Sequence, residues 1–259
     1  RSKINKEPLK ASSEISKDRK KNALKDFNKN DRKDLENYFS KLNDSYFNKN
    51  LSNSLKWQSE LIIINRDKDL IVGCKNIFEN LIEIFIKIDN SEGLFYKLTK
   101  TLECSGLNII DANIFTSTDN IFAANTFIAK FSHHDRKFSK SDLSELSKRI
   151  KKNFLQFDQI SSKQKKVKIR NNFEKRINIS ESINKDRESN LITIETSDNS
   201  GLLASIAKVF FENKISIFSA RINTLGERVE DTFEIENSDK TLVSEAKIKK
   251  IISALKKVV

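Results

Sequence analysis

An internal repeat is the feature of this 259-residue chain that most limits how it can fold. When Gly93 is aligned with Gly201, the apolar positions around the two glycines coincide without a gap: Ile84, Ile86 and Leu94 fall on Ile192, Ile194 and Leu202. Farther along, after a difference of two residues in one turn, the same alignment places Asn125-Thr126-Phe127 on Asp231-Thr232-Phe233. We infer that the chain contains two copies of one domain.

Each copy shows the same order of periodic segments. In residues 82–88, isoleucine occupies every second position and alternates with Glu83, Phe85 and Lys87, a two-residue period that is typical of a half-buried strand. Leucines at 94, 98 and 102 share one face of a helix. Strands over 110–114 and through Phe127 follow, and a second helix carries Leu143, Leu146 and Ile150.

This order lacks one strand of a ferredoxin-like unit, which has four strands and two helices. We predict that the missing strand enters first, at residues 61–64 in the first copy and 177–179 in the second. The predicted fold class is α+β, with two ferredoxin-like domains, each a four-stranded antiparallel sheet with two helices. The predicted domains are residues 61–160 and 177–259.

The remaining residues are predicted to be an arm and a linker. Residues 1–60 are expected to be a disordered arm followed by a helical linker, and residues 161–176 a basic linker between the domains. Leu35, Tyr38, Phe39 and Leu42 lie at helical spacing, so an exposed apolar face is expected there. We expect its partner in a missing part of a longer chain, because the sequence contains no Met and begins at Arg1.

The net charge of +12 comes from the arm and the linker. Residues 1–34 and 163–176 carry the whole excess of Lys and Arg, so no folded face is basic and a nucleic-acid partner is disfavoured. No apolar run approaches the roughly 20 residues that span a bilayer, and no secretory leader opens the chain. Two cysteines, Cys74 and Cys104, cannot make a disulfide framework, which indicates reduced thiols and a cytoplasmic location.

Catalytic and metal-binding patterns are missing from the sequence. His133 and His134 are adjacent and are the only histidines, so on a strand they would point to opposite faces. The glycine spacing fits neither phosphate-binding motif, and neither cysteine has a nearby histidine. We therefore expect no catalytic residue, no metal and no cofactor in this segment.

The two strand-to-helix loops are the candidate binding sites. Each ends at a helix N-terminus, where unpaired N–H groups and the helix dipole favour an anion. Asp198 offers a partner for a cation beside the anion site of the second loop. Together these groups describe a site for an α-amino acid. The alternative is that Asp, Asn and Ser in the loops only cap the helices.

The repeats resemble ACT domains, which are ferredoxin-like modules that pair and bind amino acids where they meet. TLGERVEDTF at 224–233 looks like the last ACT repeat of bifunctional uridylyltransferase/uridylyl-removing enzymes, and GLNI at 106–109 with DANIFT at 111–116 is similar to their first. The usual ACT loop, Asp-Arg-Pro-Gly-Leu, appears here as DNSGL at 198–202, while the first copy has Asn90 at the Asp position. The resemblance covers about residues 60–259.

The resemblance implies a regulatory segment that senses glutamine. Enzymes of this family attach UMP to the PII protein and remove it according to nitrogen status, and their catalytic domains, which are expected to use Mg²⁺, lie upstream of the ACT pair. Glutamine would bind with its carboxylate on a helix N-terminus, its ammonium on Asp198 and its side-chain amide on strand backbone. The expected ligand-binding residues are Asp198, Asn199, Ser200, Gly201, Leu202, Ser216, Ile217, Asn90, Ser91, Glu92, Gly93, Leu94, Asn108 and Ile109.

Two other functions remain open on the sequence. The tandem can serve another metabolic enzyme, such as an aspartokinase-like protein that senses lysine or threonine. It can also be a dimerisation module that binds nothing. The sequence does not decide which repeat binds ligand or the oligomeric state.

Overall fold

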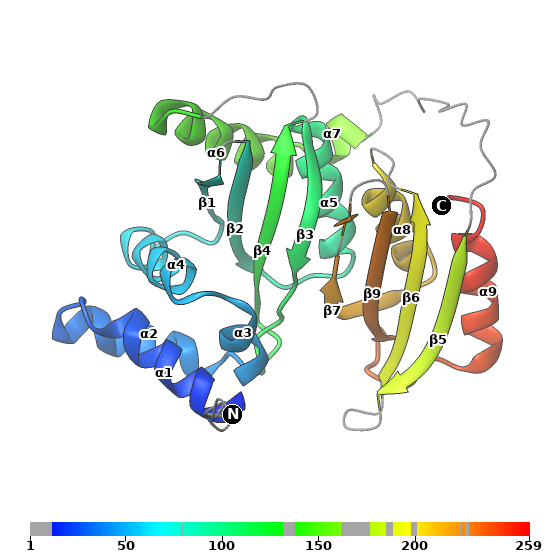
Figure 1. The fold of residues 1–259 in the computed structure, drawn as a ribbon, viewed down its shortest axis with the longest axis horizontal. Helices are drawn as coiled ribbons and strands as arrows, with labels where there is room; N and C mark the ends of the chain where they lie inside the picture. The colour runs from blue at the N-terminus through cyan, green and yellow to red at the C-terminus, as the bar shows by residue number, and fades with distance from the viewer. Residues whose placement is uncertain are drawn as a thin grey trace, which may run out of the picture.

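The computed structural model describes residues 12–78, 80–131, 138–161, 177–184, 189–197, 201–222, 224–225 and 228–259. In this part of the chain, eight strands form one continuous antiparallel sheet in the order β1-β2-β4-β3-β7-β9-β6-β5, and the short β8 pairs with β9. Figure 1 shows the two four-stranded halves side by side.

The two halves contain the same elements in the same order. The first half comprises β1 (Ile71–Phe78), β2 (Leu81–Asp89), α5 (Leu94–Cys104), β3 (Leu107–Asn113), β4 (Phe122–Phe131) and α6 (Lys140–Leu155), followed by the short α7 (Phe157–Ser161). The second comprises β5 (Asn178–Asn184), β6 (Ser189–Ser197), α8 (Leu202–Glu212), β7 (Ile215–Arg221), β8 (Thr224–Leu225), β9 (Arg228–Asn237) and α9 (Glu245–Leu255). The predicted fold class is confirmed. An additional strand does enter each unit first, but in the first unit it is β1 and not the predicted residues 61–64.

Strand register confirms the repeat residue by residue. Phe127 on β4 lies opposite Ile84 on β2, and its equivalent Phe233 on β9 lies opposite Ile192 on β6. All four side chains are fully buried in one apolar core that is continuous between the halves. The alternation that predicted the strands therefore marks the face that the helices cover.

The halves are joined edge to edge and helix to helix. β3 pairs with β7 through Asn113 and Arg221, which makes the sheet continuous. Above the sheet, α5 packs beside α8. Phe95 on α5 reaches the second unit, where its ring meets that of Phe233 at 6.2 Å in an edge-to-face contact. Strand pairing, helix packing and the apolar core all join the two units, so the units share one continuous interface.

Four helices cover the opposite face of the first half only. They are α1 (Ser12–Leu24), α2 (Lys29–Ser40), α3 (Asp44–Lys49) and α4 (Ser52–Ile64), on the left of Figure 1. Tyr38 and Phe39 pack with Phe122 and Ala124 of β4 in a second apolar core. Tyr38 stacks on Phe122 with ring centroids 5.1 Å apart.

Three expectations about this region are wrong. The apolar face of α2 packs on this chain's own sheet and not on a missing segment. Residues 12–24 form a helix, whereas a disordered arm was expected. Residues 61–64 end α4 and are not a strand, and β1 takes that place in the sheet. A short apolar run fits a strand or a buried helix equally well, so the sequence did not distinguish them.

Other expectations concern the start of the second unit, the segment between the units and the possibility of a membrane span. The predicted strand at 177–179 corresponds to β5. Most of the basic linker, residues 162–176, lies outside the described residues, and the domain boundaries stay predictions. Among the described residues, none of the helices combines the length and the apolar character that crossing a membrane requires.

Candidate functional site

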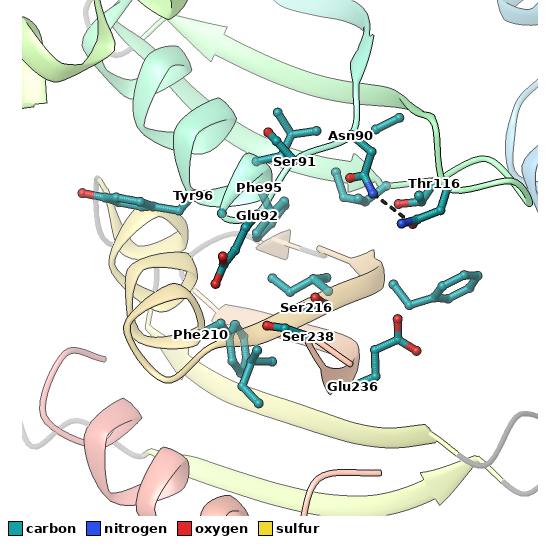
Figure 2. Close-up of a pocket in the computed structure, with 18 of the residues that line it drawn as sticks. Asn90, Ser91, Glu92, Phe95, Tyr96, Thr116, Phe210, Ser216, Glu236 and Ser238 are labelled. Carbon is teal, nitrogen blue, oxygen red and sulfur yellow. Dashed lines mark hydrogen bonds between the residues drawn. The ribbon is translucent and has the colours of Figure 1, made fainter. Parts of the chain in front are cut away.

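A cavity of about 640 Å³ opens between the two units at the N-terminus of α5. Its wall from the first unit is the loop that leads from β2 into α5 (Figure 2). Its wall from the second unit is the end of α8 and the start of β7. The cavity is therefore present only because the units pack against each other. We call it the α5 pocket.

The start of α5 is left open to a ligand by its own sequence. Gly93, at the N-cap position, adopts a left-handed backbone with φ of 71°, and no side chain caps the helix. By contrast, Ser139 and Asp142 form a capping box on α6, whereas α4 and α8 also begin without a side-chain cap. The N–H of Leu94 donates to the carbonyl of Ser91 at 3.2 Å. The next N–H groups of the first turn have no intrahelical acceptor, so they remain available to an anion. For this loop, the alternative that side chains only cap the helix is wrong.

The loop is held in place by the turn between β3 and β4. The backbone N–H of Asn90 donates to the carbonyl of Ile121 at 2.8 Å, and its side-chain Nδ2 donates to Oδ1 of Asn120 at 3.0 Å. The dashed line in Figure 2 marks the second of these bonds. Asn90 therefore serves to position the loop, which explains an amide at the position where the ACT pattern has Asp.

The same turn is fastened to the helical layer. The N–H of Thr118 donates to the carbonyl of Lys41 at 2.8 Å. The ammonium of Lys41 also lies 3.0 Å from the carboxylate of Asp119. Lys41 directly follows α2, so the rim of the α5 pocket is in contact with α1–α4 as well as with both repeats.

Aromatic side chains from both units form the apolar part of the pocket. Tyr96 on α5 stacks on Phe211 on α8, with centroids 5.8 Å apart and planes 20° from parallel. A Cβ added at Gly93 would lie 2.5 Å from the ring of Phe211. Glycine is therefore required at position 93 both by the backbone conformation and by this ring.

Asn125 on β4 is the most unusual polar residue in the lining. Its side chain is 1% exposed, and within the described part of the chain neither Oδ1 nor Nδ2 has a hydrogen-bond partner. It lies on the helix-covered face of the sheet, since its neighbours Ala123 and Phe127 belong to the core beneath α5. A buried amide normally has its hydrogen bonds satisfied, so this pair of unpartnered atoms needs an explanation.

Charged groups line the mouth of the pocket. Glu92 is exposed beside the start of α5, and Glu236 contributes from β9 (Figure 2). Lys240 is the cation in the lining. Carboxylates near a set of free N–H donors suit a small molecule that carries both a carboxylate and an ammonium group.

A second pocket occupies the equivalent place at the start of α8, but it is almost filled. Its volume is about 20 Å³. Gly201 again has a left-handed backbone, with φ of 78°. A Cβ on Gly201 would lie 2.9 Å from Oε1 of Glu103, the residue equivalent to Phe211. A carboxylate of this chain therefore lies at the start of α8. Glu103 also forms an ion pair with Lys100 at 3.0 Å.

The predicted site residues divide between the two pockets in a crossed arrangement. The α5 pocket brings together the loop of the first repeat and the strand start of the second: Asn90, Ser91, Glu92, Gly93, Leu94, Ser216 and Ile217. The second pocket pairs Gly201 and Leu202 with Asn108 and Ile109. Asp198, Asn199 and Ser200 lie outside the described residues, so the proposed ammonium contact on Asp198 stays a prediction.

Sequence reasoning missed several lining residues. Tyr96, Phe211 and Glu236 carry no signal of their own, because aromatic and acidic residues are common on helices and strand ends. Asn125 did leave a signal, since it interrupts the apolar run of β4. It is also aligned with Asp231, which lines the second pocket.

The residues considered for other chemistry offer little in the structure. His133 and His134 lie outside the described residues. No group of three or more His, Cys, Asp or Glu side chains that can hold a metal occurs in the part of the chain that is described. Burial raises the pKa of the Cys74 thiol to about 11, so this thiol is protonated near neutral pH.

Comparison with known proteins supports the resemblance seen in the sequence. The chain is 28% identical over 229 residues to the bifunctional uridylyltransferase/uridylyl-removing enzyme of Psychrobacter sp. (strain PRwf-1), covering 84% of this chain and 25% of the relative. It is 29% identical over 210 residues to the enzyme of the same name from Pasteurella multocida (strain Pm70), covering 78% and 23%. The chain thus spans about a quarter of the length of these curated relatives. The resemblance to this family is confirmed over most of the chain.

Other comparisons add less. No protein-family model matches the chain. Among solved structures, aspartate kinase from Synechocystis aligns with a TM-score of 0.37 and 15% identity, covering 69% of this chain and 26% of the kinase.

Proposed function

We propose that this chain is the glutamine-sensing regulatory region of a bifunctional uridylyltransferase/uridylyl-removing enzyme. In this proposal, it controls the attachment of UMP to the PII protein and its removal according to nitrogen status. The observation that carries the proposal is the α5 pocket, a cavity built by both repeats at a helix N-terminus that no side chain caps. The names of the relatives supply the enzymatic activity.

The proposed ligand pose follows from the chemistry of the lining. The ligand carboxylate accepts hydrogen bonds from the first turn of α5, where the helix dipole favours negative charge. Glu92 and Glu236 attract the ammonium group. The side chain of the ligand then extends toward the second unit and the floor of the pocket.

Such a ligand acts as a clamp between the repeats. It touches α5 and its loop from one unit and β7 from the other, so it favours the arrangement in which those elements are close. The rim turn, held by Lys41, carries that preference into α1–α4. Coupling energies of roughly 1–3 kcal/mol, which are typical of allostery, change affinities about 5- to 150-fold.

Catalysis in this proposal is performed by the rest of the longer enzyme, with PII as its protein substrate. The Mg²⁺ that the resemblance implies belongs to that part of the enzyme, and we assign none of its ligands to this chain. This division agrees with the share of the relatives that the chain covers.

Isothermal titration calorimetry on this 259-residue chain tests the proposal. We expect heat of binding with glutamine, and an affinity lower by up to about fivefold in Glu92→Gln, since a single exposed charge contributes roughly 0.2–1 kcal/mol. Glu60→Gln, an exposed substitution on α4, is the matched control and leaves the affinity unchanged. Heat with lysine or threonine but not glutamine would assign the tandem to another enzyme. No heat with any amino acid would favour the dimerisation module.

A further inference from the structure

We propose that Asn125 is the residue that selects a carboxamide side chain over a carboxylate in the α5 pocket. This inference rests on the proposed function, because it names the group that distinguishes glutamine from glutamate. Its basis is the combination of a cavity and a buried amide that none of the residues described by the structure satisfies.

Leaving the side-chain amide of Asn125 without hydrogen bonds costs free energy. The side chain is 1% exposed, and both of its polar atoms are buried without a partner. A buried amide loses its hydrogen bonds to water and gains none from the protein, which is unfavourable. A residue kept in that state at the wall of a cavity is explained if a ligand completes its hydrogen bonds.

The amide of Asn125 pairs better with a ligand carboxamide than with a carboxylate. Asn125 presents one acceptor, Oδ1, and one donor, Nδ2, on the same planar group. A ligand carboxamide also has one carbonyl and one NH₂, so two such groups pair reciprocally. A carboxylate can accept from Nδ2 but has no hydrogen for Oδ1, and two acceptor oxygens then face each other without a proton. The buried amide therefore discriminates between the two side chains.

The second repeat has a carboxylate, Asp231, at the position equivalent to Asn125. Asn125 lies opposite Ile86 in the sheet, and Asp231 lies opposite Ile194, so the two positions are structurally equivalent. Asp231 is also buried, but it is a carboxylate and lines the nearly filled second pocket. Of these two equivalent positions, an amide that can pair with a ligand carboxamide is thus present in the pocket that has room for a ligand.

The test measures glutamine and glutamate binding to this chain by calorimetry, in the wild type, Asn125→Leu and Asn125→Ala. Wild type should bind glutamine at least about tenfold more tightly than glutamate, because glutamate loses the hydrogen bond to Oδ1 and places an acceptor oxygen against it. Asn125→Leu keeps the branched shape but removes both hydrogen-bonding atoms, so glutamine affinity should fall about tenfold and the preference should disappear. Asn125→Ala repeats the test if the leucine variant does not fold.

Thr101→Val is the matched control. Thr101 is also buried with an unpartnered hydroxyl, but it is not part of the pocket lining, so its substitution should leave both affinities unchanged. Wild-type binding without a preference for glutamine, or a preference that survives in the Asn125 variants, would overturn the inference and leave the proposed function intact. Absence of binding by the wild type to either amino acid would overturn both.

Discussion

Gly93 illustrates how a single residue shapes the α5 pocket. It combines a left-handed backbone with a ring close enough to touch any added side chain, whereas the other left-handed glycines differ in their surroundings. At Gly106 the nearest atom to an added Cβ is 3.9 Å away, so only the backbone conformation matters there.

We therefore predict different costs for Gly93→Ala and Gly106→Ala. Gly106→Ala should lower the free energy of unfolding by about 1–2 kcal/mol, the usual cost of a left-handed alanine. Gly93→Ala should cost more, because its Cβ also meets Phe211. Adding Phe211→Ala should recover part of that excess in urea unfolding. Equal losses in the two single variants would show that the ring does not constrain position 93.

Asp119 is the residue at the pocket rim whose charge depends most clearly on its contacts. A hydrogen bond from Ser117, followed by one from Lys41, lowers the pKa of its carboxyl to about 2. An acid whose pKa is lowered in the folded state stabilises the fold above its ordinary pKa, and this contribution is lost as the pH falls through the folded value.

The corresponding prediction is a pH-dependent difference in melting temperature between wild type and Asp119→Asn. The wild type should melt higher from pH 7 down to about 5, and the difference should shrink between about pH 4 and 2 as Asp119 takes up a proton. Thermal unfolding followed by circular dichroism at each pH gives the measurement. A difference that stays constant down to pH 2 would mean that the charge of Asp119 contributes nothing.

At the scale of elements, β4 has two faces with different tasks. Asn125 faces the pocket, while Thr126 faces the helical layer. The Thr126 hydroxyl accepts from Nε2 of Gln58 at 3.1 Å and donates to Oδ1 of Asn50 at 3.2 Å. This buried network attaches α4 and the end of α3 to the strand that lines the pocket. A displacement of β4 would therefore be transmitted to α3 and α4.

A pair of equivalent threonines tests that attachment. Thr126→Val should lower the free energy of unfolding by about 1–3 kcal/mol, because Gln58 and Asn50 lose a buried partner. Thr232→Val changes the equivalent residue on β9, whose hydroxyl meets only that of Thr193 at 3.2 Å, and should change stability by less than about 0.5 kcal/mol. Urea unfolding of both variants gives the comparison. Similar losses would contradict a special role of the network.

The elements themselves were largely predictable from the sequence, and their partners were not. Alternation and helical spacing identified β2, α5 and their counterparts because the core beneath α5 and α8 takes every second strand residue and one face of each helix. The apolar face of α2 was also visible, but an amphipathic face does not specify what it packs against. The helical layer on the first half therefore emerged only from the structure.

The candidate site was predictable to a similar degree. Glycines before two helices, aligned by the repeat, led to both loops, and the structure places Gly93 and Gly201 each beside a strand of the other repeat. The role of Asn125 was not predictable, because whether a buried amide finds a partner depends on packing between distant segments. The inequality of the pockets has the same origin, since Glu103 and Phe211 act across the interface.

At the scale of the whole molecule, near symmetry with one open pocket is the main property. The repeats form a continuous sheet and a shared core, so a ligand at their interface acts on both. One pocket has a volume of about 640 Å³, and in the other Glu103 of this chain lies where a ligand carboxylate would bind. We therefore expect one glutamine per chain, held at α5.

Hydrogen exchange with mass spectrometry, with and without saturating glutamine, tests this account most directly. We predict slower exchange in residues 90–98, 114–126 and 207–218, which carry the walls of the α5 pocket, and no change in residues 107–109 and 201–204. Protection confined to the second pair of segments, or no protection at a glutamine concentration that saturates the calorimetric signal, would contradict a ligand site between the repeats at α5.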